Sequence, residues 1–323
     1  PMSTATPIPE TVELTGDDAW ETLRDAGRGR LLKDAFQRMR YADGFSHARS
    51  MAFLTTLVLV QGTIAVVGLA SVLGTNRLTH GIVNAIHVIA PGPSGRILTS
   101  AVSQARQAGV SGDKLAIAFG LFGALVSGTT AMAQLERGLN RLYGIERDRP
   151  ALHKYGLAFG LTVTAGLLLA AAFLAIGFGP AIGRAFGSEG ADTLWSWLRW
   201  PTAVLAMSAA VALLFRWCPR RRQPGWSWLT FGSSVSVVLW FLITLAMGQV
   251  FRLSSSFGDT YGPLAGIVAL QFWAVLTAMA LLFGGAVTAQ LEAVRAGRPA
   301  PADPAPGESS AELRPDRRPA MSA

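Results

Sequence analysis

The residues with the most suggestive chemistry in this sequence lie around position 140. Glu136, Asn140 and Tyr143 are spaced i, i+4 and i+7, so a helix would carry them as one polar stripe. Arg147 and Arg149 follow within a few residues. A carboxylate and an amide with nearby guanidinium groups can contact a lipid headgroup or act as a polar gate. The alternative is a solvated helix end with an exposed Glu–Arg pair, which contributes only ~0–1 kcal/mol. We expect Glu136 and Asn140 to face a helical bundle, with Arg147 or Arg149 closing the cluster.

Two amides interrupt long apolar runs. Gln61 lies near the middle of one run and Gln271 lies inside another. A buried amide in an apolar medium requires hydrogen-bonding partners, so both side chains should face other helices. Hydrogen bonding between helices is the interpretation we favour, and lining of a lumen is the alternative.

Other catalytic or metal-binding residue types are sparse. His80, Asn84 and His87 would share one helical face, but no acidic residue lies near them, so exposed polar positions are favoured over a metal pair. Cys218 is the single cysteine, which excludes an intramolecular disulfide and a cysteine-based zinc site. We predict no catalytic residue, no cofactor and no metal.

The elements that must position these residues are six apolar runs, each about as long as a bilayer core requires. Half of the 323 residues are apolar and only 15% are charged, which excludes an ordinary soluble enzyme and a coiled coil. The predicted spans are 51–73, 114–135, 155–183, 199–217, 227–250 and 264–290. The fold class is therefore an all-α polytopic membrane protein with a membrane domain over residues 43–297.

Basic residues predict the orientation of these spans. The segments before the first span and after the second, fourth and sixth carry 21 of the 28 lysines and arginines. Because lysine and arginine concentrate on the cytoplasmic side, both termini are predicted to be cytoplasmic and the membrane to be the plasma (inner) membrane. The net charge of +8 suits anionic lipid headgroups as partners, and nucleic acid is not needed to explain it.

The segments that flank the spans differ in character. Residues 1–16 and 298–323 are expected to be disordered tails, because they carry little apolar surface. Residues 17–42 predict an amphipathic helix with an apolar stripe of Leu32, Ala35, Phe36 and Met39. That helix lies either in the membrane interface or against the cytoplasmic end of the bundle.

The loop between the first two spans, residues 74–113, predicts two short amphipathic helices around the turn Pro91–Gly95. Ile82, Ile86 and Ile89 share a face of the first helix. Both helices are too short to span a bilayer, so we expect them on the outer surface or shallowly inserted.

Three stretches of this sequence are similar to one known family. They are Asp43-Gly44 with Ser50-Met51-Ala52-Phe53, then Glu136-Arg137-Gly138-Leu139-Asn140 through Arg149-Pro150, and Tyr261-Gly262-Pro263-Leu264-Ala265-Gly266 with Trp273 and Gly284-Gly285. Together they resemble the YihY/virulence factor BrkB family, formerly described as ribonuclease BN-like. The sequence departs from that family at Gln61, where a proline is usual, and after Gly285, where an acid is usual.

The resemblance implies a six-span inner-membrane protein with cytoplasmic termini, and some relatives are proposed to export lipids or lipopolysaccharide. The function we predict is assistance to lipid or glycolipid movement or to envelope integrity. A scaffold for envelope proteins, with protein partners or a homo-oligomer, is the alternative. A ribonuclease ranks last, because the cytoplasmic acids are scattered and RNA hydrolysis requires metal-binding carboxylates or an acid–base pair.

Overall fold

The structure is a computed structural model that describes residues 5–72, 76–111, 114–177, 189–253 and 264–302. Within these residues the chain is all-α, as the sequence predicts. The helices are α1 Gly16–Ala26, α2 Arg28–Tyr41, α3 Gly44–Val72, α4 Asn76–Ile89, α5 Pro93–Val110, α6 Lys114–Leu142, α7 Ala151–Gly177, α9 Glu189–Trp217, α10 Trp226–Leu253 and α12 Leu264–Arg295.

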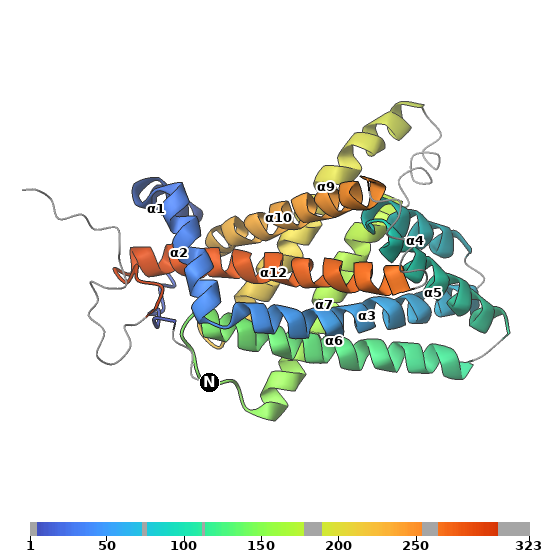
Figure 1. Cartoon of the computed structure of the whole chain (residues 1–323), viewed down its shortest axis with the longest axis horizontal. Helices are drawn as coiled ribbons and strands as arrows, with labels where there is room; N and C mark the ends of the chain where they lie inside the picture. The colour runs from blue at the N-terminus through green and yellow to red at the C-terminus, as the bar shows by residue number, and fades with distance from the viewer. Residues whose placement is uncertain (1–4, 73–75, 112–113, 178–188, 254–263, 303–323) are drawn as a thin grey trace, which may run out of the picture.

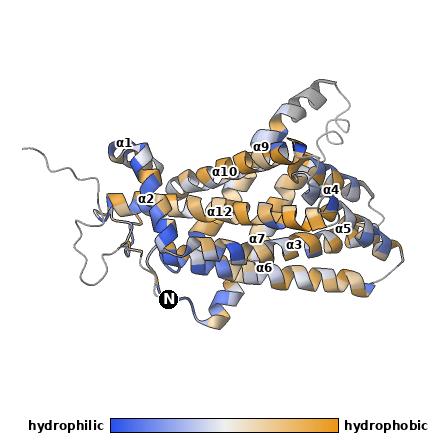
Figure 2. Ribbon diagram, viewed as in Figure 1, coloured by the Kyte–Doolittle hydropathy of each residue, from blue (hydrophilic) through white to orange (hydrophobic). Residues whose placement is uncertain are grey.

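Six of these helices are long and apolar enough to cross a membrane, which confirms the predicted number of spans. They are α3, α6, α7, α9, α10 and α12, and hydrophobic residues predominate along them (Figure 2). A helix satisfies its own backbone hydrogen bonds, which is why it can cross a medium without water. Pro201 stands inside α9, so the fourth apolar run belongs to a longer helix than predicted. Residues 178–183 of the predicted third span lie outside the described residues.

The helix α12 is the centre of the bundle (Figure 1). It packs against α10 on one side and α3 on another, and α2 and α5 cover its two ends. The two backbones approach closely where Gly232 of α10 meets Gly284 of α12, because a Cβ added to Gly232 would lie 2.7 Å from the backbone oxygen of Gly284. The two glycines therefore allow α10 and α12 to pack backbone against backbone.

The helices α4 and α5 form a hairpin that packs into one end of the bundle. Ile86 of α4 and Leu98 and Val102 of α5 are buried in one cluster with Trp273 of α12. The sequence identified the apolar faces correctly. However, those faces are buried against neighbouring spans, because α5 contacts both α3 and α12. We call this the hairpin end of the bundle.

The opposite end carries α1, α2, the loops 143–150 and 218–225, and both described chain ends (Figure 1). We call it the basic end. Residues 5–15 and 298–302 lie in segments expected to be disordered, but the structure packs them here. Ala5 and Ala302 form an isolated bridge, and Ile8 donates a backbone hydrogen bond to the backbone oxygen of Tyr143 at 3.3 Å. Residues 1–4 and 303–323 lie outside the described part of the chain.

The predicted amphipathic helix is two helices that meet at Gly27, whose φ of 77° favours glycine. Its buried face is shifted from the predicted stripe. Leu31, Ala35 and Met39 pack into the core, whereas Leu32 and Phe36 are exposed at 43% and 50%. The helix α2 therefore contacts the bundle with one face and leaves a second apolar face open.

Candidate functional site

Glu136 and Arg149 meet at the basic end. The carboxylate of Glu136 is 2% exposed, and its Oε1 lies 3.2 Å from Nη1 of Arg149. That guanidinium also donates from Nη1 to the backbone oxygen of Cys218 at 2.7 Å and from Nη2 to that of Pro219 at 2.8 Å. Arg149 thus ties the end of α6 to the end of α9. Because Glu136 is buried, this is not the exposed pair considered from the sequence.

Asn140 is fully buried one turn further along α6. Its Oδ1 accepts a hydrogen bond from the backbone N–H of Arg220 at 2.8 Å, and its Nδ2 donates to Asp148 Oδ1 at 3.2 Å. Asp148 also accepts from Lys154 at 2.7 Å and from Arg137 at 3.1 Å. Burial raises the pKa of Asp148, but these hydrogen bonds outweigh it and lower the pKa to about 2. We call this group, Glu136, Arg149, Asn140 and Asp148, the loop clamp, since it holds loop 143–150 against loop 218–225.

The structure separates the other two predicted residues from the loop clamp. The side chain of Arg147 is exposed, and its backbone oxygen accepts a hydrogen bond from Arg220 at 3.3 Å. Tyr143 is buried directly after the last residue of α6, under the guanidinium of Arg221 at 4.6 Å from the ring centroid. Burial raises the pKa of the Tyr143 hydroxyl.

A second buried ionic group, which the sequence reasoning missed, lies beside Tyr143. Arg221 pairs with Glu292 of α12, and both side chains are almost fully buried. Glu292 also accepts from Thr11 of the N-terminal segment. Nearby, Arg38 of α2 donates to Gln290 at 2.8 Å and to the backbone oxygen of Thr6 at 3.0 Å. The available signal was an acid, Glu292, at the end of the last apolar run.

Gln61 and Gln271 form hydrogen bonds between spans. Ser127 of α6 donates to Gln61 at 3.0 Å, and Thr56 of α3 donates to Gln271 at 3.0 Å. Both amides therefore join α3 to a neighbour, which is the interpretation favoured from the sequence. The remaining polar candidates lie apart from these groups: His80, Asn84 and His87 are exposed on α4. The motif residues Tyr261, Gly262 and Pro263 lie outside the described residues.

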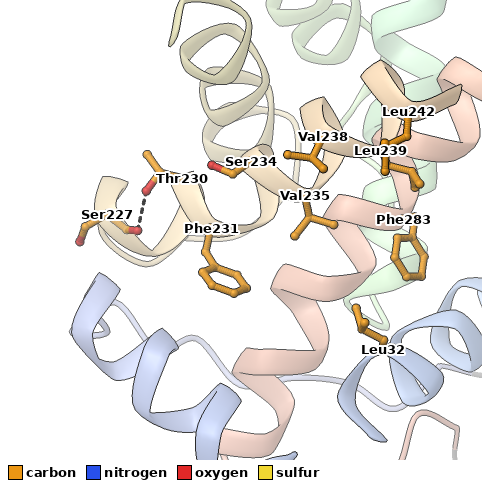
Figure 3. A pocket seen from close by; sticks show the side chains of 10 residues that line it. All are labelled: Leu32, Ser227, Thr230, Phe231, Ser234, Val235, Val238, Leu239, Leu242 and Phe283. Atoms are coloured by element: carbon orange, nitrogen blue, oxygen red, sulfur yellow. Dashed lines mark hydrogen bonds between the residues drawn. The ribbon is translucent and has the colours of Figure 1, made fainter. Parts of the chain in front are cut away.

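An apolar groove of about 550 Å³ opens on the side of the bundle between α10, α12 and α2 (Figure 3). Eight residues of α10 line it at helical spacing from Ser227 to Leu242, and Phe283 and Leu32 face them. The stripe is about 22 Å long, since each helical residue rises 1.5 Å. Ser227 and Thr230 place hydroxyls at the basic end, Ser234 lies midway along the stripe, and the remaining wall is hydrocarbon.

The groove exists because α1 and α2 diverge above α10. The helix α1 packs on α10, whereas α2 packs on α12. Gly16 donates its backbone N–H to Ser227 Oγ at 3.0 Å, which fixes the start of α1 at the Ser227 end of the groove. We call this end the groove mouth. Sequence reasoning missed this groove, because α10 shows only a weak preference for one apolar face and the lining comes from three separate helices.

Comparison with known proteins gives one family and distant relatives. The model of the family described as virulence factor BrkB matches residues 35–308. The putative ribonuclease-like protein YfkH of Bacillus subtilis (strain 168) is 25% identical over 81% of this chain and 94% of its own. A UPF0761 membrane protein of Stenotrophomonas maltophilia (strain K279a) is 24% identical over 88% of this chain and 66% of its own. No solved structure matches the chain.

Proposed function

The chain belongs to the virulence factor BrkB family of membrane proteins, and we propose that it assists the movement of lipid or glycolipid molecules in the plasma membrane. The basic end faces the cytoplasm in this proposal, so both termini are cytoplasmic. The positive-inside rule supports that orientation, because arginines concentrate in α2 and in the loops of the basic end.

The observation that carries the proposal is the lateral apolar groove. A groove open to the side of a membrane helix bundle contacts lipid directly, without an aqueous path. Its volume of about 550 Å³ falls within the range of small-molecule sites. Its hydroxyls lie between the basic end and the middle of the stripe, and the half toward Leu242 is hydrocarbon only, which matches the polarity of a lipid lying along α10.

The loop clamp supports the groove as a scaffold in this proposal and does not act as a chemical centre. Glu136, Asp148 and Glu292 are each paired with a guanidinium or ammonium group. Carboxylates held in this way are poorly placed to act as a general base or to bind a divalent metal. We therefore propose a protein that is not an enzyme, although one relative carries a ribonuclease-like name.

A lipid-flip assay tests the proposed function. The full chain is reconstituted in liposomes with a fluorescent phospholipid, and dithionite bleaches the outer leaflet. We expect bleaching beyond the outer-leaflet fraction, and we expect Leu239→Trp, which fills the groove, to slow it.

The matched control is Leu245→Trp, because Leu245 is a leucine of the same helix that is 52% exposed and does not line the groove. Bleaching that stops at the outer leaflet for the unaltered chain would reject lipid movement and favour the scaffold function. Equal slowing by both variants would reject the groove as the path.

A further inference from the structure

The groove mouth is flanked by cationic and aromatic side chains of α1 and α2. The guanidinium groups of Arg24 and Arg28 lie 5.2 Å and 5.7 Å from the ring centroid of Trp20. These are cation–π distances, so one exposed indole ring positions both charges. Arg28 precedes the lining residue Leu32 by four residues, which places the two side chains on one face of α2.

These two arginines present their charge beside the groove. Two of the four acids of α1, Asp18 and Glu21, are each paired with Arg295 at 3.0 Å. Arg24 and Arg28 contact the indole ring of Trp20 and are both exposed, so their guanidinium groups can reach a ligand from solvent or from the membrane surface. A guanidinium binds a phosphate through paired hydrogen bonds, which an ammonium group cannot match.

The exposed face of α2 continues this pattern away from the mouth. Leu32 and Phe36 are exposed, and the ring of Phe36 packs edge-on against Phe45 at the start of α3. Exposed apolar side chains beside arginines on a helix are typical of a helix at the membrane interface. The mouth of the groove therefore lies at the depth of lipid headgroups, and its hydrocarbon wall extends toward the bilayer centre.

We propose that the groove is a binding site for one acidic phospholipid of the leaflet at the basic end, with an acyl chain along α10 and its phosphate held by Arg28 and Arg24. Ser227 and Thr230 lie where the glycerol and ester oxygens would be. The groove length of about 22 Å exceeds half of a ~30 Å hydrocarbon core but not the whole of it, so it accommodates a lipid from one leaflet only. This inference rests on the proposed function and names the class of lipid that the same groove takes.

The test measures lipid retained by the full chain in neutral detergent. Protein is incubated with equal amounts of phosphatidylglycerol and phosphatidylcholine of identical acyl chains, and bound lipid is counted by native mass spectrometry. We expect a preference for phosphatidylglycerol of about thirtyfold, which corresponds to two arginines near an anionic headgroup at ~1 kcal/mol each. Soluble glycerol phosphate should not compete, because it cannot use the hydrocarbon wall.

Two variants separate the parts of the site. Arg28→Gln should reduce the preference by about fivefold and leave total lipid binding nearly unchanged. Arg30→Gln is its control, because Arg30 is an exposed arginine on another face of α2. Leu239→Trp should reduce binding of both lipids by about tenfold, whereas Leu245→Trp should not.

Each outcome decides between the claims. Equal binding of the two lipids, or identical effects of Arg28→Gln and Arg30→Gln, would overturn the acidic-lipid site even if flipping is observed. A dimer that dissociates in Leu239→Trp while lipid binding is unchanged would assign the groove to a second copy of the chain and also overturn it. Selective binding without flipping would reject the proposed function and leave this site intact.

Discussion

Replacing Gly232 with alanine should destabilise the bundle, although alanine is the better helix former. The added Cβ would overlap Thr288 Oγ1 and lie 2.7 Å from the backbone oxygen of Gly284. The hydroxyl of Thr288 can rotate, but the oxygen of Gly284 belongs to the helix backbone. The helices α10 and α12 must therefore separate by several tenths of an ångström.

The magnitude follows from two opposing terms. Overpacking of this kind costs about 1–3 kcal/mol, and alanine recovers ~1 kcal/mol of helix propensity. Gly232→Ala should then be destabilising by up to about 2 kcal/mol, and by about 1–3 kcal/mol relative to a glycine-to-alanine change that meets no neighbour. The control is Gly248→Ala in the same helix, where a Cβ meets nothing within 4 Å and only the favourable propensity term remains.

The single cysteine provides the assay. Cys218 is 1% exposed, and burial raises the pKa of its thiol, so a fluorogenic maleimide should react only after unfolding. Heating each variant in the same detergent at one scan rate should give Gly232→Ala a midpoint roughly 5 °C below that of Gly248→Ala. An equal or higher midpoint for Gly232→Ala would refute backbone-to-backbone packing of α10 and α12 at this point.

Three further predictions concern the basic end and the orientation. Arg149→Leu should leave Glu136 buried without its charge partner and destabilise the protein by about 3–5 kcal/mol in the maleimide melt. Combining Arg149→Leu with Glu136→Gln should recover much of that loss, because the buried charge is then removed as well. No recovery in the double variant would contradict a direct pair. The pKa of Asp148 is lowered to about 2, so its carboxylate stabilises the fold above the unfolded pKa of ~3.9, and that contribution is lost as the pH falls toward 2. Asp148→Asn should therefore melt at a lower temperature than the unaltered chain at pH 7. The difference between the two melting temperatures should shrink at pH 3. Reporter fusions at residue 95 and at residue 305 should report opposite compartments, and the same compartment for both would reject the six-span topology.

The fold class could be predicted from the sequence because membrane insertion is read from local composition. A run of about 20 apolar residues must form a helix in lipid, whatever its neighbours are. The six spans follow from that rule, whereas the apolar faces of α4 and α5 follow from helical periodicity. The pairing of Glu136, Asn140 and a nearby arginine was also accessible, because those residues lie within about 15 positions of one another along one helix and its following loop.

The buried ionic contacts of the basic end and the groove are visible only in the tertiary structure, because they join segments that lie far apart in the chain. Arg38 meets Gln290, and Arg221 meets Glu292, across separations that no local pattern encodes. Arg38 and Arg221 also hold residues 5–15 in place, because they donate hydrogen bonds to the backbone oxygens of Thr6 and Pro9. The composition of residues 5–15 contains no sign of these distant partners. The groove could not be predicted from the sequence either, because its walls come from three helices, α2, α10 and α12. The space between helices depends on the angles between their axes, which the sequence of a single helix does not specify.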